Sequence, residues 1–228
     1  MGRKVGCRQI IFTSSVSPYG PTDSAKTEDS IPTPATAYGS SKLAAEKIHI
    51  GWQRVAGGRR LVIVRPGVVF GPGEDGNVTR LIRALLKGYF FYAGNWSTRK
   101  AGGYIKELLN TLFWALDRIP DSGGICLYNF TMPDPPTVED YVNTICHVAG
   151  VKRSVRTLPY PLLLAASYLI EDIARLFGFN QPISPVRARK LIHSNNIEPA
   201  VLKRGGYQFQ FTLETAMQDW IKDRPDDW

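Results

Sequence analysis

Short apolar runs and stretches of helical periodicity alternate along the first third of the chain. The runs RQIIF at residues 8–12 and LVIV at 61–64 have the nearly all-apolar composition of strands that a parallel sheet buries on both faces. Between them, good helix formers occupy residues 36–55, and Gly57 and Gly58 follow as a helix stop. The pattern predicts a strand, a helix and a second, parallel strand.

The rest of the chain is richer in helices. Helical periodicity occurs at residues 78–86, 105–116, 137–150, 163–177, 185–194 and after Thr212, and short strands are predicted at 90–96 and 126–130. Thr137, followed three positions later by Asp140, and Thr212 are predicted helix caps. Residues 17–34, rich in Pro, Ser, Thr and Asp, are predicted to form an exposed loop. Together these elements predict an α/β sheet with a smaller, helix-rich lobe across its carboxyl edge.

The longest apolar stretch, LPYPLLLAASYLI at residues 158–170, is shorter than the roughly 20 residues that cross a bilayer. Its continuation keeps a helical period. We therefore expect no transmembrane span, and a helix that belongs to the core or lines a groove rather than an interfacial anchor.

Composition excludes several classes of protein. With 228 residues and 43% hydrophobic content, the chain is neither disordered nor fibrous. Three widely spaced cysteines, without a signal peptide, predict reduced thiols and a cytoplasmic location, and the cysteines and histidines predict no metal site. The net charge of +8 is scattered, so we expect no nucleic-acid partner; it would suit an anionic substrate or an acidic membrane surface.

One group of residues has the spacing of a catalytic acid/base site. Tyr38 and Lys42 lie four residues apart in the helical segment AYGSSKLAAEK and so share one helix face, where the ammonium favours the phenolate that a general base requires. The apolar strand at 8–12 ends opposite them in three hydroxyl-bearing residues, Thr13, Ser14 and Ser15.

The chain here resembles the extended short-chain dehydrogenase/reductase family, which contains the NAD-dependent sugar-nucleotide epimerases and dehydratases. Four segments carry the resemblance in the family's order: IIFTSSVSPYG, AYGSSKLAAEK, LVIVRPGVVFGPG and the stretch from YNFTMPDPPTVEDYV. The resemblance implies the C-terminal part of a Rossmann-like doubly wound sheet over residues 1–75, and mainly a substrate-binding lobe, with some elements returning to the sheet, over 76–228. It also implies an NAD or NADP cofactor and a nucleotide-sugar substrate.

The resemblance also assigns roles to residues. Tyr38 would be the catalytic acid/base, Lys42 would assist it and bind the nicotinamide ribose, and Ser15 would bind the same substrate oxygen as Tyr38. Further cofactor contacts would come from Thr13, Ser14, Tyr38, Lys42, Pro66, Gly67 and Val68. Asn77 and Arg99 are candidate contacts of the substrate diphosphate, since a guanidinium suits phosphate oxygens. Lys106 stands where the family usually has an acidic residue.

The family opens with a strand, a Gly-rich turn and a helix that hold the dinucleotide. The sequence begins just before the family's serine-bearing strand, so we expect this nucleotide-binding half to be lacking. We do not expect GVVFGPGEDG to be this loop, because we read its glycines as departing from the spacing G-x-G-x-x-G, Pro66 and Pro72 remove backbone donors, and the stretch follows the Tyr/Lys helix. We expect the chain alone to be inactive, and to form a homodimer or depend on another chain, since losing half a sheet exposes a strand edge.

Three functions remain open. The first is a sugar-nucleotide epimerase, dehydratase or reductase. The second is an oxidoreductase of the hydroxysteroid dehydrogenase type, a branch that shares the same motifs. The third is a catalytically inert remnant that binds a partner or serves as a structural module.

Overall fold

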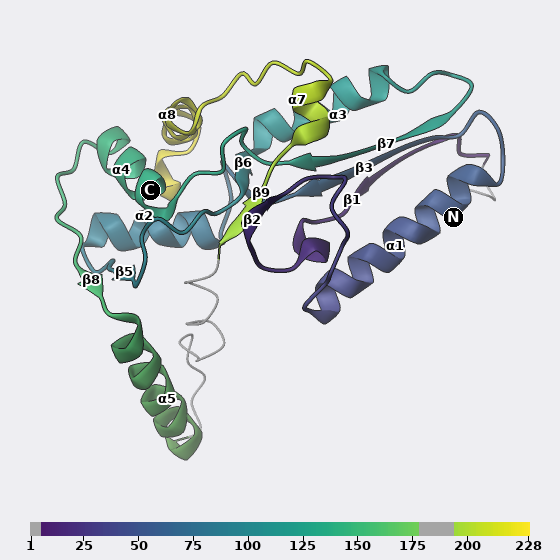
Figure 1. Cartoon of the computed structure of the whole chain (residues 1–228). Helices are drawn as coiled ribbons and strands as arrows, with labels where there is room; N and C mark the ends of the chain where they lie inside the picture. The colour runs from purple at the N-terminus through teal and green to yellow at the C-terminus, as the bar shows by residue number, and fades with distance from the viewer. Residues whose placement is uncertain (1–5, 178–193) are drawn as a thin grey trace.

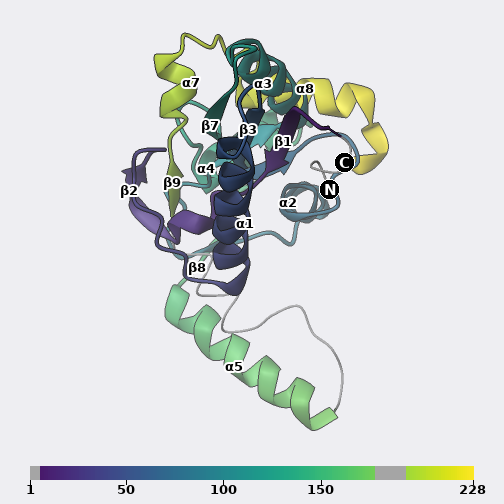
Figure 2. The same ribbon diagram turned by 90° about the vertical axis from the view of Figure 1, so that its right-hand side faces the viewer.

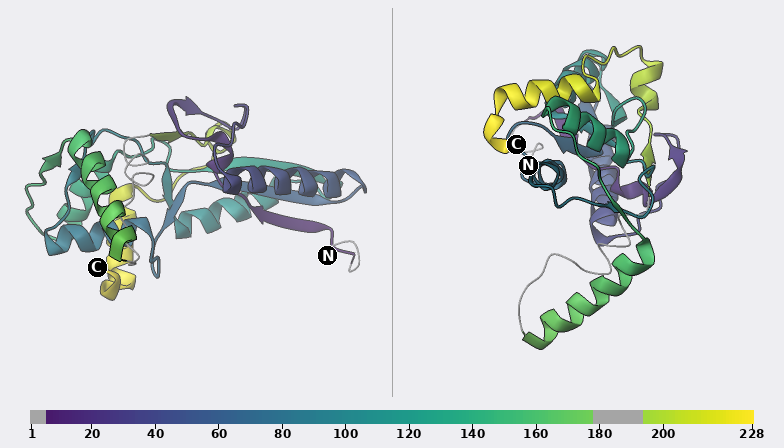
Figure 3. Two further views of the ribbon diagram at one scale, coloured as in Figure 1. Left: turned by 90° about the horizontal axis from the view of Figure 1, so that it is seen from below. Right: turned by 90° about the vertical axis from the view of Figure 1, so that its left-hand side faces the viewer.

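The structure is a computed structural model that describes residues 6–177 and 194–228. Its centre is a parallel sheet of three strands in the order β1-β3-β7. These strands are β1 (Gln9–Thr13), β3 (Arg60–Pro66) and β7 (Gly124–Phe130). Helix α1 (Ala37–Arg54) covers one face of the sheet and α3 (Ile105–Asp117) the other (Figures 1 and 3). This arrangement confirms the predicted α/β class.

Strand β3 is the middle of the sheet. Its residues 61–64 are completely buried, as their all-apolar sequence predicts. On one side of β3, Arg60 lies opposite Gln9 of β1. On the other side, the same residue lies opposite Gly124 of β7. Strand β1 is an edge: within the described residues it pairs only with β3, and Ile11 remains 42% exposed.

The helix-rich lobe has its own core. Helices α2 (Asn77–Lys87), α4 (Val138–Val148) and α8 (Leu213–Asp223) pack around buried Phe70, Ile82, Tyr104, Ile145 and Trp220. The rings of Phe70 and Trp220 stack with their centres 6.2 Å apart. Both predicted caps are confirmed as capping boxes, Thr137 at α4 and Thr212 at α8.

Short strand pairs join distant parts of the chain. They are β2 (Thr22–Lys26) with β9 (Asn195–Ile197), β4 (Val68–Phe70) with β6 (Gly102–Tyr104), and β5 (Tyr92–Ala93) with β8 (Thr157–Leu158). The remaining short helices are η1 (Ser17–Tyr19), α7 (Ala200–Arg204) and η2 (Pro225–Asp227). Among these short strands and helices, only β5 lies in a segment for which the sequence predicted its type of structure. The segment predicted as a loop at 17–34 contains β2. Its polar sequence TDSAK does not indicate a strand, because the strand forms through pairing with the distant β9.

Helix α5 (Tyr160–Phe177) projects away from the rest of the molecule (Figures 1 and 2). Leu163 is buried, but Leu162 is 60% exposed, so the helix differs from the core helix that its apolar sequence predicts. In the part of the chain that the structure describes, no helix has the length and apolar content to cross a membrane. The helix predicted at 185–194 falls almost entirely outside the described residues.

Candidate active site

The start of α1 is fixed against the short helix η1. The side chain of Thr36 caps α1 by accepting the Gly39 N–H at 3.1 Å. Gly39 lies against the carbonyl of Ser17, and a Cβ at this position would come within 2.7 Å of that oxygen. Only glycine permits this approach, which places Tyr38, on the first turn of α1, at the carboxyl edge of the sheet with 55% of its surface exposed.

Lys42 connects α1 to the end of β1. Its Nζ donates a hydrogen bond to the carbonyl oxygen of Thr13 at 2.9 Å. The same Nζ lies 5.8 Å from the centre of the Tyr38 ring and 5.3 Å from that of Phe12. The structure therefore brings Thr13, Tyr38 and Lys42 together, as the i, i+4 spacing predicts.

The two serines after β1 have different surroundings. The Ser15 hydroxyl accepts the N–H of Ser17 at 3.1 Å and donates to the Ser17 hydroxyl at 3.0 Å, and its side chain is half-buried. Ser14 is buried, and its hydroxyl donates to Glu46 at 2.5 Å. Successive side chains along extended backbone point to opposite sides. The structure thus directs the Ser14 hydroxyl into the protein. The cofactor contact that the resemblance implies for Ser14 stays a prediction.

A buried polar network lies beneath this edge, and the sequence analysis missed it. Arg65 donates two hydrogen bonds to the carboxylate of Glu46, at 2.8 and 2.5 Å, and a third to the Tyr19 hydroxyl at 2.6 Å. Tyr19 donates in turn to the side-chain oxygen of Asn129 at 3.0 Å, and burial raises the pKa of its phenol. Because Glu46 also accepts from Ser14, the network ties α1 to the ends of all three strands. The one sequence signal for this network is Arg65, a charged residue at the end of an otherwise apolar strand, which requires a buried partner.

Residues 66–68 use their backbone groups inside the protein. The N–H of Gly67 donates to Phe130 at 3.0 Å and that of Val68 to Ala101 at 2.9 Å, while the Pro66 carbonyl accepts from Val16 at 3.0 Å. A Cβ on Gly67 would lie 2.4 Å from the Ala101 oxygen, so glycine is required by packing. Both amide N–H groups are therefore engaged within the protein, and cofactor contacts by Pro66, Gly67 and Val68 stay predictions.

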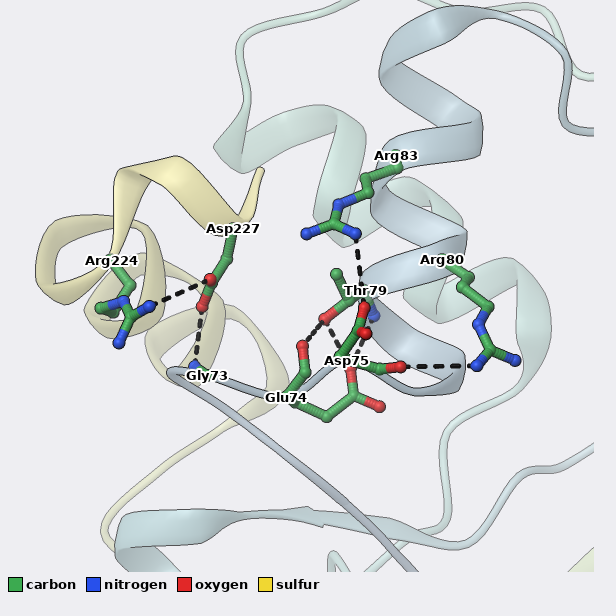
Figure 4. Close-up of polar contacts among 8 residues, drawn as sticks. All are labelled: Gly73, Glu74, Asp75, Thr79, Arg80, Arg83, Arg224 and Asp227. Atoms are coloured by element: carbon green, nitrogen blue, oxygen red, sulfur yellow. Dashed lines mark hydrogen bonds and ion pairs between the residues drawn. The ribbon is translucent and has the colours of Figure 1, made fainter.

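The loop at 71–76 corrects one point of the sequence argument. Gly71, Gly73 and Gly76 do satisfy the spacing G-x-G-x-x-G, so spacing alone does not exclude a phosphate loop. The contacts give the better reason (Figure 4): the Gly73 N–H donates to the Asp227 carboxylate at 2.8 Å, and Glu74 accepts the Thr79 N–H at 2.8 Å at the start of α2. The chain's own carboxylates occupy the donors that a phosphate would need.

Asn77 and Arg99, the two predicted diphosphate contacts, do not belong to the group formed by Thr13, Tyr38 and Lys42. Asn77 is the first residue of α2, next to the helix terminus that Glu74 occupies. Arg99 donates to the carbonyl of Pro135 at 2.8 Å. Their roles in substrate binding stay predictions.

Lys106 belongs to the packing of the lobe. Its Nζ forms ion pairs with Asp219 and Asp223, both at 2.6 Å, and so links α3 to α8. Tyr104 donates to the same Asp219 carboxylate at 2.5 Å. This pairing accounts for a lysine at a position where the family usually has an acid.

Asp227 predicts a pH dependence of stability. The Gly73 N–H and then the Trp220 indole hold the pKa of this carboxyl below its usual range. The stabilisation is therefore present above the unfolded-state pKa of about 3.9 and is lost as pH falls through the lower folded-state pKa. We expect Asp227→Asn to lower the free energy of unfolding at pH 7 by about 1–2 kcal/mol and to flatten its acid decline, measured by urea denaturation. Asp226→Asn, at an exposed neighbour, is the control; equal acid curves for the two variants would contradict the assignment.

A parallel sheet with α1 on one face and α3 on the other defines an α/β protein of Rossmann-like architecture (Figure 1). Residues 1–127 match the NAD dependent epimerase/dehydratase family, and the chain belongs to this family.

Similar proteins cover almost all of the chain. It is 26% identical, over 98% of its length and 69% of the relative's, to N-acetyl-alpha-D-glucosaminyl-diphospho-ditrans,octacis-undecaprenol 4-epimerase of Escherichia coli O157:H7. It is 25% identical, over 96% of its length and 53% of the relative's, to 3beta-hydroxysteroid-dehydrogenase/decarboxylase isoform 1 of Arabidopsis thaliana. Among solved structures, UDP-glucose 4-epimerase of Thermus thermophilus, in complex with NAD, has a TM-score of 0.68 at 19% identity, over 97% of this chain and 65% of its own. The chain thus spans between about half and two thirds of the length of these proteins.

Proposed function

We propose that this chain carries the proton-transfer part of an NAD(P)-dependent epimerase that acts on a sugar linked to a diphosphate. The observation that carries the proposal is the bond from Lys42 to the Thr13 carbonyl, which holds the ammonium beside the Tyr38 ring at the end of β1. The proposal concerns what this arrangement does when a cofactor and a substrate are present.

The chain's residues would divide the work as follows. The Tyr38 phenol, exposed at the sheet edge, takes the proton of a sugar hydroxyl and returns it. The Lys42 ammonium, which the Thr13 carbonyl holds beside that phenol, binds the cofactor ribose. The Ser15 hydroxyl, which Ser17 orients, holds the reacting sugar oxygen. A bound nicotinamide supplies the hydride acceptor and donor.

The cofactor fits this chain in part. Tyr38 and Lys42 suit its nicotinamide ribose, whereas within the described residues the loop at 71–76 does not suit its pyrophosphate, because Asp227 occupies the Gly73 N–H and Glu74 the Thr79 N–H that follows the loop. We therefore propose that a nucleotide-binding half pairs along the exposed edge of β1, from a second polypeptide or another part of a longer one. In this proposal residues 1–75 complete a cytoplasmic Rossmann-like domain, and 76–228 mainly hold the substrate, with Asn77 and Arg99 as candidate contacts.

The substrate class follows from what two similar proteins share. The E. coli relative acts on a sugar joined through diphosphate to undecaprenol, and the T. thermophilus protein on UDP-glucose. Both substrates are sugars attached to a diphosphate, which supports a 4-epimerase on such a sugar. The second candidate, a 3β-hydroxysteroid oxidoreductase, is supported by the Arabidopsis relative.

A reconstituted enzyme tests the choice. The nucleotide-binding part of the E. coli relative is fused ahead of β1, and the fusion is given NAD with UDP-N-acetylglucosamine or with a 3β-hydroxysteroid. We expect the C4 epimer of the sugar, detected by chromatography, and no NADH from the steroid. Steroid oxidation alone would favour the second candidate, and no turnover of either by a fusion that binds NAD would leave the inert, partner-binding module as the explanation.

A further inference from the structure

Helix α5 projects away from the rest of the molecule (Figures 1 and 2), and part of its surface is exposed and apolar. Leu163 and Ser167 are buried on one side of the helix. The opposite arc is exposed and consists of Leu162, Ala165, Ala166 and Tyr168. Positions i, i+3 and i+4 form one stripe on a helix, so these side chains make a continuous apolar surface. A contiguous exposed surface of this kind marks an interaction site.

Exposed aromatic side chains lie beside the start of α5. The pairing of β5 with β8 places residues 92–93 next to 157–158. Phe91, immediately before β5, and Tyr89 are both largely exposed. The ring of Trp96, 44% exposed, lies 6.1 Å from that of Tyr92. Amphipathic aromatic rings are the side chains that favour the boundary between water and lipid.

Positive charge borders the same surface. Lys152, Arg153 and Arg156 are exposed in the segment that leads into β8, and Arg153 donates to the Leu86 carbonyl at 2.6 Å, at the end of α2. Arg156 is joined to β5, since its carbonyl accepts the Tyr92 N–H at 2.9 Å. Acidic residues on adjoining elements include Glu139 at the start of α4, whose N–H donates to the Trp96 carbonyl at 3.2 Å, and Glu171 in the second half of α5.

We propose that these residues form a lipid-facing surface by which the chain lies on an anionic membrane, with the outer face of α5 in the headgroup region. Apolar, aromatic and basic side chains in one place match the three properties of such an interface. The apolar face suits insertion along the membrane plane, because one side of α5 is buried against the protein and the other is exposed and apolar. A second copy of this chain is a poorer occupant, since it would bring two exposed basic segments into one interface.

The test is vesicle flotation of the full 228-residue chain, because aggregates sink in a density gradient while bound protein rises. With phosphatidylcholine vesicles that contain about a quarter phosphatidylglycerol, we expect the chain to float, and to bind pure phosphatidylcholine about tenfold more weakly or less. Leu162→Glu, and separately Lys152→Gln with Arg156→Gln, are each expected to reduce binding to the anionic vesicles by about tenfold or more.

The control is Ile48→Glu, which places the same charge on an exposed apolar position of α1, and it is expected to float like the unaltered chain. Unchanged circular dichroism excludes misfolding of the variants. Absence of flotation, or flotation that Leu162→Glu does not reduce, would overturn the proposal. If sedimentation velocity shows a dimer that Leu162→Glu dissociates while flotation is unaffected, the surface is a contact between copies instead. The test uses no turnover, so its result is independent of the proposed function.

Discussion

Replacing Tyr38 by Phe is expected to lower kcat of the reconstituted enzyme by about 10²–10⁴-fold, the usual contribution of a general acid/base. The change removes one oxygen from a ring that is 55% exposed, so the melting temperature should stay the same. The rate is measured as formation of the C4 epimer at saturating substrate. Substrate binding should change much less than kcat, because the phenol acts on the proton during the chemical step.

Lysines on the same helix give a matched comparison. Lys42→Met removes the ammonium that bonds to the Thr13 carbonyl and should also lower kcat strongly. Lys47→Met removes an exposed ammonium five residues further along α1 and should leave turnover unchanged. A Tyr38→Phe enzyme that retains the unaltered rate would show that this phenol is not the acid/base.

The second large effect is on stability. Glu46→Ala is expected to lower the free energy of unfolding by about 3–5 kcal/mol, because it leaves the Arg65 guanidinium buried without its carboxylate and the Ser14 hydroxyl without its acceptor. Replacing both partners, Glu46→Leu with Arg65→Met, should cost much less than the single change, since no unpaired charge remains. Chemical denaturation of both variants measures the difference.

An exposed ion pair provides the comparison for this experiment. The Arg83 Nη1 and Asp75 Oδ1 atoms lie 3.4 Å apart on the surface. Arg83→Met should therefore change the free energy of unfolding by less than about 1 kcal/mol. If Glu46→Ala costs no more than Arg83→Met, or if the double variant is as unstable as the single, the Glu46–Arg65 pair does not hold α1 to the sheet.

Local signals made the main elements predictable. The all-apolar run in β3 required burial on both faces, and Thr137 and Thr212 placed the starts of α4 and α8 within a residue. The i, i+4 spacing of Tyr38 and Lys42 likewise predicted a shared helix face. In each case the cause lies within a few residues of the effect.

What could not be predicted depends on distant partners. Strand β2 is polar and exists because β9, far along the chain, pairs with it. The direction of the Ser14 hydroxyl is set by Glu46, and Glu46 can be buried because Arg65, from the next strand, donates to its carboxylate. The exposure of α5 is equally invisible in its composition, which favours burial. Sequence periodicity shows that a face is apolar, but not what covers it.

The central claim is that this chain supplies the proton-transfer site, while the pyrophosphate of the cofactor is held elsewhere. Calorimetric titration with NAD tests it most directly. We predict no measurable heat of binding for the 228-residue chain, because Asp227 occupies the Gly73 N–H of its glycine loop and Glu74 occupies the Thr79 N–H at the start of α2. We predict saturable binding for the reconstituted enzyme. Saturable binding of NAD by the chain alone, abolished by Gly73→Ala in its glycine loop, would contradict the claim.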